Sequence, residues 1–417
     1  ELMRTMEVRK TQVFVWVFVV EVIYLVNLAF CGNLKVSNTE GLDYCIELVK
    51  KAAKADVLPK LGVDIMGVHL TSKAFVYSEL NIVNHLLQLF KVGSDSVRSE
   101  IKRYLQLPDN SICEELYCKH FQTLMDVITS TMGDKYYYGS VLFKDKSKSG
   151  PSWECGTEKT LDFQKSKESI VTEINNEYQN IVKLKQAQCL LDSLYKDTDF
   201  FMMNPFWVNL ALFGVMGSHI SSQKFLDLDG EERKVEWVEM EGFFRVKKMS
   251  LPQIVSQNSQ NCDLILYSKQ INGYSQYMLY FQVTFRLIKN VNFKIECIME
   301  VFNNIRKYAA LAIDTRVGGD RLIVPAMSIQ TDINLRSLME EDLPSLFKYK
   351  EIINLYTDPD TLYQMRSCDF FYNKDKDFSV SQVSSPLKEV YINGPFVFAL
   401  FDRGTRIFLK TGAYLRP

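Results

Sequence analysis

Histidine is the side chain best suited to acid–base catalysis and metal binding near neutral pH. The chain has only four: His69, His85, His120 and His219. None of them form a metal-binding pair at helical spacing, and the sequence lacks both a Gly-x-Ser-x-Gly motif and a glycine-rich phosphate loop ending in Lys-Ser/Thr. The first three lie on or beside helix-like segments, so we interpret them as structural or solvated. The sequence therefore predicts no enzyme, no metal site and no cofactor.

Cysteine is the other reactive side chain, and the chain has nine. Cys31 falls in an N-terminal apolar run, and the other eight are spread from Cys45 to Cys368. Cys113 and Cys118 are five positions apart, which is not zinc-ligand spacing. A chain of this size forms a core without disulfides. We therefore expect mostly buried free thiols, with one or two disulfides.

The composition limits the class of protein. Of the 417 residues, 47% are hydrophobic, which excludes a wholly disordered chain and a fibrous repeat. The 49 Lys+Arg and 50 Asp+Glu residues give a net charge of −1. Such a chain has no overall field that attracts nucleic acid, so we expect no nucleic-acid partner. Length alone suggests two or three domains.

The N-terminal stretch is typical of a secretory signal peptide. Arg9 and Lys10 precede an apolar run from Val13 to Phe30, and small residues follow it. A signal anchor is the alternative, because the run is near the lower length limit of a spanning helix. A charge inside a membrane span is costly, so Glu21 favours a cleaved signal over a stable membrane anchor.

These features divide the chain into a signal peptide over residues 1–32 and a mature chain over residues 33–417. Met3 or Met6 is the expected initiator, so we expect the residues before it to be spurious. The sequence contains no Asn-x-Ser/Thr acceptor for N-glycosylation. We expect a secreted, extracellular, monomeric protein.

Helical periodicity dominates the first half of the chain and strand patterns dominate the second. The expected helices cover residues 42–55, 80–90, 96–105, 113–130 and 167–184. The expected strands cover residues 75–77, 136–143, 200–213, 233–240, 276–288 and two segments within 394–417. Residues 321–347 read as a strand followed by a short helix. This order indicates an α+β fold with an antiparallel-rich sheet.

Four segments, in the same order, resemble the serpin family. In "FVYSELNIVNHLLQLF", Ser78 matches the family's Ser-Pro, and Glu79 stands in place of the proline. "VPAMSIQTDINLRSLMEEDLPSLF" resembles the family's proline-containing strand and the helix after it. The remaining matches are single positions in the segments "DFQKSKESIVTEINNEY" and "GPFVFALFDRGTRIFLKTGAYLRP": Asp162, Phe163, Ile174, Asn175, Pro395, Phe396, Phe398, Gly412 and Pro417.

The resemblance covers residues 60–417 and implies a single serpin-like domain. It implies a large mixed β-sheet, two smaller sheets and about eight or nine helices. It also implies a reactive loop, at about residues 374–392, that a protease would cut. In inhibitory serpins the cut loop inserts as a new strand into the central sheet, and the protease stays trapped.

The hinge of the expected loop departs from the family. Inhibitory serpins have small residues there, whereas this chain has charged ones. Because strand side chains alternate between two faces, insertion in either register buries charges. The residues at the hinge are Lys374, Asp375, Lys376, Asp377, Phe378, Ser379 and Val380.

The loop is also short, and its candidate scissile region contains one basic residue, Lys388. This region comprises Ser384, Ser385, Pro386, Leu387, Lys388 and Glu389. The residues favour a non-inhibitory protein that acts by binding an extracellular serine protease or another secreted protein. One alternative is a covalent inhibitor of trypsin-like enzymes with its bait near Lys388. Another is a carrier of a small ligand.

Overall fold

The structure is a computed structural model. It describes residues 39–69, 74–130, 136–147, 155–183, 185, 188–189, 198–208, 216–219, 221–251, 262–271, 275–285, 290–315, 317–347, 362–372 and 389–417. Residues 1–44 and residues 45–417 form two separate units. The account below concerns the second unit, which contains both large sheets.

Eight helices of nine residues or more lie in the described part of the chain. They are α2 (Thr39–Ala52), α3 (Val57–Val68), α4 (Glu79–Val92), α5 (Asp95–Tyr104), α7 (Tyr117–Ser130), α8 (Lys167–Val182), α9 (Val291–Asn303) and α10 (Ile305–Ile313). Two shorter helices are α6 (Ser111–Glu114) and α11 (Leu335–Met339).

Polar residues fix where several of these helices begin. The hydroxyl oxygens of Ser78, Ser94 and Ser166 each accept a hydrogen bond from the backbone amide three residues later. The side chains of Asn110 and Asn290 cap α6 and α9 in the same way. Each cap satisfies amides that have no partner within the helix.

A nine-stranded sheet carries most of the second half of the chain. Its order is β1 (Ala74–Tyr77), β18 (Ile407–Tyr414), β17 (Phe396–Asp402), β12 (Gln276–Phe285), β11 (Cys262–Gln270), β10 (Trp237–Ser250), β13 (Val317–Pro325) and β16 (Glu389–Tyr391), with β7 (Met216–His219) paired to β10. All pairs are antiparallel except β13 with β16.

A seven-stranded mixed sheet forms the other large layer. Its order is β2 (Tyr136–Tyr138), β6 (Phe206–Val208), β15 (Leu362–Tyr372), β5 (Thr198–Met203), β3 (Val141–Asp145) and β4 (Thr157–Leu161), with β14 (Ser328–Asn334) paired to β15. A two-stranded sheet joins β8 (Phe225–Leu226) and β9 (Glu232–Arg233). The expected α+β fold, with mixed and smaller sheets, is confirmed.

The strands expected near the C-terminus form the buried hairpin β17–β18. Every residue of both strands is buried. A side chain at Gly412 would place its Cβ 2.4 Å from the carbonyl oxygen of Phe75 and 2.6 Å from the ring of Phe398. Glycine at this position therefore allows β1 and the Phe398 ring to pack closely.

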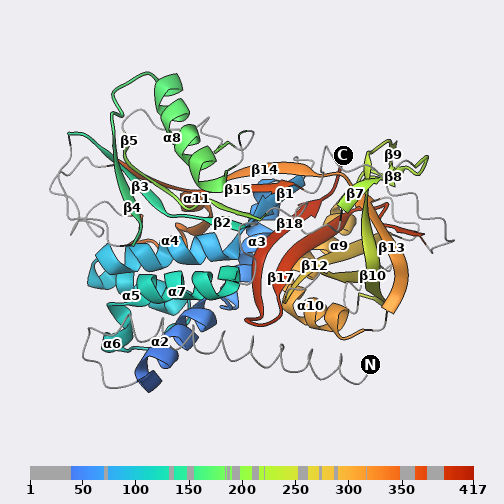
Figure 1. Cartoon of the computed structure of the whole chain (residues 1–417), viewed down its shortest axis with the longest axis horizontal. Coiled ribbons are helices and arrows are strands. Elements are labelled where there is room, and N and C mark those ends of the chain that lie inside the picture. Colours follow the sequence, from blue (N-terminus) through green and yellow to red (C-terminus); the bar gives the residue numbers. More distant parts are fainter. Residues whose placement is uncertain are drawn as a thin grey trace, which may run out of the picture. The chain divides into compact units, whose positions relative to one another are not determined.

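Helices cover both faces of the seven-stranded sheet (Figure 1), with α8 on one side and α4, α5 and α7 on the other. Four residues of α8 at helical spacing are buried against the sheet: Ile170, Ile174, Tyr178 and Val182. Their partners on the strands are Val141, Phe143, Phe201, Met203 and Trp207. The expected amphipathic helix at residues 167–184 thus exists and packs through its apolar face.

Candidate functional site

The expected reactive loop joins β15 to β16. Its hinge, Lys374 to Val380, and the candidate scissile residues Ser384 to Lys388 lie outside the described residues. Glu389, the last residue of the candidate scissile region, is the first residue of β16. The two strands that flank the loop therefore define the described part of the site.

The strand that precedes the expected loop, β15, is paired directly with two neighbouring strands. β15 pairs in parallel with β5 over Leu362–Arg366 and with β6 at Asp369. Beneath the junction of β5 and β6, the Asn204 amide donates to the backbone carbonyl of Asn81 on α4, at 3.4 Å. Insertion of a loop strand here would have to break the ladder between β15 and β5.

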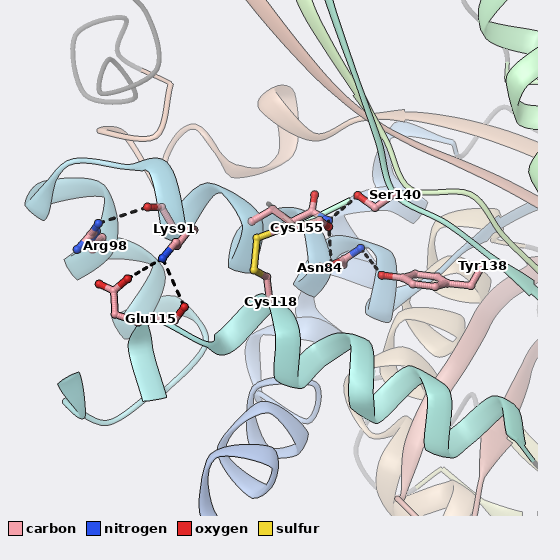
Figure 2. Close-up of a disulfide and its surroundings, with 9 residues drawn as sticks. Asn84, Lys91, Arg98, Glu115, Cys118, Tyr138, Ser140 and Cys155 are labelled. Carbon is pink, nitrogen blue, oxygen red and sulfur yellow. Dashed lines mark hydrogen bonds and ion pairs between the residues drawn. A yellow bond between two sulfur atoms is a disulfide. The ribbon is translucent and has the colours of Figure 1, made fainter. Parts of the chain in front are cut away.

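Polar side chains on α4 hold the outer strands of this sheet (Figure 2). Asn84 donates to the Tyr138 hydroxyl at 2.6 Å. Gln88 donates from one amide nitrogen to the Ser140 hydroxyl at 2.5 Å and to the Cys155 carbonyl at 3.2 Å. Buried polar groups of this kind specify one arrangement, because a shift of the strands would leave them unpaired.

A disulfide fixes the same region covalently. Cys118 on α7 is bonded to Cys155, two residues before β4. Figure 2 shows this bond between Cys118 and Cys155, near Asn84. We call the Cys118–Cys155 disulfide with Asn84 and Gln88 the β4 clamp. It ties the edge of the seven-stranded sheet to the helices below it.

The expectation of mostly free thiols is wrong. Cys45 is bonded to Cys113, and Cys262 to Cys297, in addition to the bond within the β4 clamp. Cys189 is also disulfide-bonded. The partners are far apart in sequence and meet only in the folded chain. Disulfides persist in oxidising compartments, so this number of bridges is typical of a protein that folds in one.

At the C-terminal end of the expected loop, two polar residues of β16 interact with three polar residues from other strands. Arg321 on β13 contacts Glu239 at 3.0 Å and Glu389 at 3.7 Å. His219 on β7 contacts Glu239 at 3.2 Å through Nδ1 and the Tyr391 hydroxyl at 2.9 Å through Nε2. The Tyr391 hydroxyl donates to Glu389 at 3.1 Å. We call this group the β16 clasp.

The clasp compensates for the shortness of β16, which has only three residue pairs with β13. The ring of Tyr391 also packs edge-on against Trp237, with ring centroids 5.4 Å apart. Burial raises the pKa of the Tyr391 hydroxyl, so it stays a neutral hydrogen-bond donor at physiological pH. The C-terminal end of the loop is therefore firmly attached to the nine-stranded sheet.

The histidines interpreted as structural lie in or beside the core. His85 and His120 are buried, and burial lowers the pKa of His69 and of His120. Across the described residues, no group of three or more His, Cys, Asp or Glu side chains could hold a metal ion. Within the same residues, no helix has the length and apolar character needed to cross a bilayer.

The sequence reasoning missed two parts of this site. Lys144 on β3 pairs with Glu158 on β4 at 2.8 Å, a contact between two strands that the sequence reasoning did not anticipate. The members of the β16 clasp come from four strands separated by tens of residues, so no local motif marks them.

Neither a protein-family model nor a curated protein sequence matches the chain. Solved structures do match it over most of its length. Protease nexin-1 with heparin has a TM-score of 0.64 at 14% identity, covering 89% of this chain and 100% of its own. Thyroxine-binding globulin in complex with thyroxine has a TM-score of 0.63 at 16% identity, covering 88% and 99%. A serpin from the trematode Schistosoma haematobium has a TM-score of 0.64 at 12% identity, covering 88% and 100%.

These identities are low, so the matches establish the architecture and leave the activity to be argued from the site. The three structures each match 88–89% of this chain at TM-scores of 0.63–0.64. The chain has the serpin fold.

Proposed function

We propose that this chain is a secreted member of the serpin family that acts by binding another protein and does not trap proteases. The observation that carries the proposal is the charge at the loop hinge. Lys374 and Lys376 alternate with Asp375 and Asp377. An unpaired charge buried in a sheet costs several kcal/mol, and each insertion register buries two.

Features of the described residues support the same reading. A strand that entered between β5 and β15 would first have to break the parallel ladder that joins them. The β4 clamp opposes the sideways movement of β3 and β4 that a wider sheet would require. Two features therefore oppose insertion of the loop: the charges of its hinge and the attachment of the sheet's edge by the β4 clamp.

The proposed location rests on the N-terminal signal at residues 1–32 and on the disulfides. With a mature chain from residue 33, the protein folds in the secretory pathway, where such bonds form. The proposed partner is an extracellular serine protease, or another secreted protein, bound by a monomer. N-terminal sequencing of the secreted protein tests the location, with Gly32 or Asn33 as the expected first residue.

Exposure to trypsin-like proteases tests the activity. The loop contains Lys376 and Lys388, so we expect cleavage there, release of active protease and an unchanged melting temperature of the cut protein. A covalent complex that survives SDS, or a large rise in melting temperature after cleavage, would contradict the proposal. It would instead support the inhibitor with its bait at Lys388.

A hinge variant separates the two features that oppose insertion. In Lys376→Ala/Asp377→Ala, the second charged pair is removed while the β4 clamp is intact. A rise in melting temperature after cleavage of this variant would assign the barrier to the hinge charges. Lys388→Ala is the matched control, because it removes a cleavage site and leaves the hinge unchanged.

The small-ligand carrier is the second alternative, and its support is the similarity to thyroxine-binding globulin in complex with thyroxine. A carrier would gain thermal stability with a hydrophobic ligand, by mass action on the folded state. A thermal-shift screen with thyroxine as the first probe tests this reading.

A further inference from the structure

A fully buried carboxylate lies where β1 meets α4. Glu79 is the first residue of α4 and has no exposed surface. Neither of its oxygens accepts a hydrogen bond from any described residue. Its closest cation is Arg306 on α10, with Nη2 at 3.6 Å. That distance exceeds hydrogen-bond length, so the carboxylate is poorly compensated for its loss of water.

The groups around Glu79 do not supply the missing donors. Arg306 uses its Nη1 to donate to the Lys54 carbonyl, and its Nε and Nη2 have no hydrogen-bond acceptor among the described residues. Tyr77 on β1 and Thr411 on β18 face each other as a strand pair. Neither buried hydroxyl makes a hydrogen bond of standard geometry within the described chain, although Thr411 lies close enough to oppose the rise that burial causes in the Tyr77 pKa.

The packing leaves little freedom to rearrange this cluster. Tyr77 and Thr411 are fully buried, and a Cβ at Gly62 on α3 would lie 2.3 Å from the Tyr77 hydroxyl. The cap residue Ser78 is bound to the Leu409 carbonyl at 2.9 Å. Strands β1 and β18 and helices α3 and α10 therefore enclose Glu79.

A carboxylate in this position has two ways to lower its free energy: to move into water or to take up a proton. The enclosure prevents the first. The protonated form is neutral, and its hydroxyl can donate a hydrogen bond where the carboxylate can only accept one.

We propose that Glu79 is a proton switch, neutral when the protein is in mildly acidic solution and ionised above neutral pH, and that ionisation loosens the junction of β1, α4 and α10. The charged or titratable groups that face Glu79 are Arg306 from α10 and Tyr77 from β1. Lys54 meets the cluster through its backbone carbonyl, behind Arg306.

The direction of the effect follows from proton linkage. Burial raises the pKa of Glu79 to about 7, and Arg306 opposes this shift only in part. The folded state then binds the proton more tightly than the unfolded state does. Stability is therefore gained as the pH falls through neutrality, and lost as the pH rises from about 5 to about 8. Paired carboxylates show the opposite dependence.

The test is unfolding of the full chain, disulfides intact, as a function of pH. Between about pH 5.5 and about pH 8, Glu79 alone should raise the unfolding equilibrium constant of the wild type by about 30-fold. In Glu79→Gln this increase should disappear, and the variant should be the more stable protein at pH 8. His69 and His120 titrate in both proteins, so the difference between the two profiles isolates Glu79.

Glu239→Gln is the matched control, because Glu239 is also a buried glutamate but is paired with Arg321 and His219. It should lower stability, and the increase with pH that Glu79 causes should remain. Parallel profiles for the wild type and Glu79→Gln would overturn the proposal. If Glu79→Gln does not fold, infrared spectroscopy of the wild type decides: a protonated carboxyl band that persists to about pH 6 and is lost by about pH 8 supports the switch, and its absence at pH 6 refutes it.

Discussion

The Cys118–Cys155 disulfide allows a direct test of whether the helices hold the seven-stranded sheet closed. The perturbation is replacement of both cysteines by alanine. The bond joins residues 37 positions apart. The entropy of closing such a loop in the unfolded chain corresponds to about 4 kcal/mol of stability at 25 °C.

The Cys262–Cys297 disulfide provides a matched control. Its sequence separation is 35, so its removal should lower the free energy of unfolding by the same amount, about 4 kcal/mol. It joins β11 to α9, beside the nine-stranded sheet, and does not touch the β4 clamp. Urea unfolding of the two double variants should therefore give similar losses of unfolding free energy.

Hydrogen exchange should distinguish the two variants. Loss of the Cys118–Cys155 bond should accelerate exchange of the backbone amides in β5 and β15, because the outer strands can then move away from α7. Loss of the Cys262–Cys297 bond should leave these amides at the rate set by global unfolding. If the amides of β5 and β15 exchange at equal rates in the two variants, the β4 clamp does not hold the seven-stranded sheet closed. This conclusion would stand whatever the change in unfolding free energy.

The other predictions concern the core, the β16 clasp and the close packing at Gly412. Phe398→Ala should lower the free energy of unfolding by about 3–5 kcal/mol through a core cavity, and a loss below about 1 kcal/mol in urea unfolding would contradict this. Arg321→Gln leaves Glu239 and Glu389 without their shared cation, and should accelerate exchange of the Ile392 amide, which donates to Ile323, while β17 stays protected. Gly412→Ala should destabilise the protein by several kcal/mol in thermal unfolding, because its Cβ would overlap the Phe75 carbonyl.

Local patterns in the sequence predicted the elements that carry strong apolar periodicity. The strand at Phe75–Tyr77, the helix across the seven-stranded sheet and the C-terminal hairpin are each defined within about twenty residues. Their side chains alternate or repeat in register with the core face, so burial and sequence agree.

The site was less predictable because its parts are assembled by the fold. Disulfide partners 35 to 68 residues apart meet only when α2, α7 and α9 are packed. From the sequence, Glu79 could be identified only as the residue that stands in place of the family's proline. Its unusual environment comes from Arg306, more than two hundred residues away, which no local pattern connects to it.

The position of β17 and β18 has a consequence for synthesis of the chain. These strands come from residues 396–414, yet they are interior strands that fill the space between β1 and β12. During translation, β1 therefore waits for its partner, and the edge of β12 stays unpaired until the last part of the chain leaves the ribosome. Such open edges pair readily with other chains. The nascent chain therefore carries open strand edges late in its synthesis, and a premature stop before residue 396 should release an aggregation-prone chain.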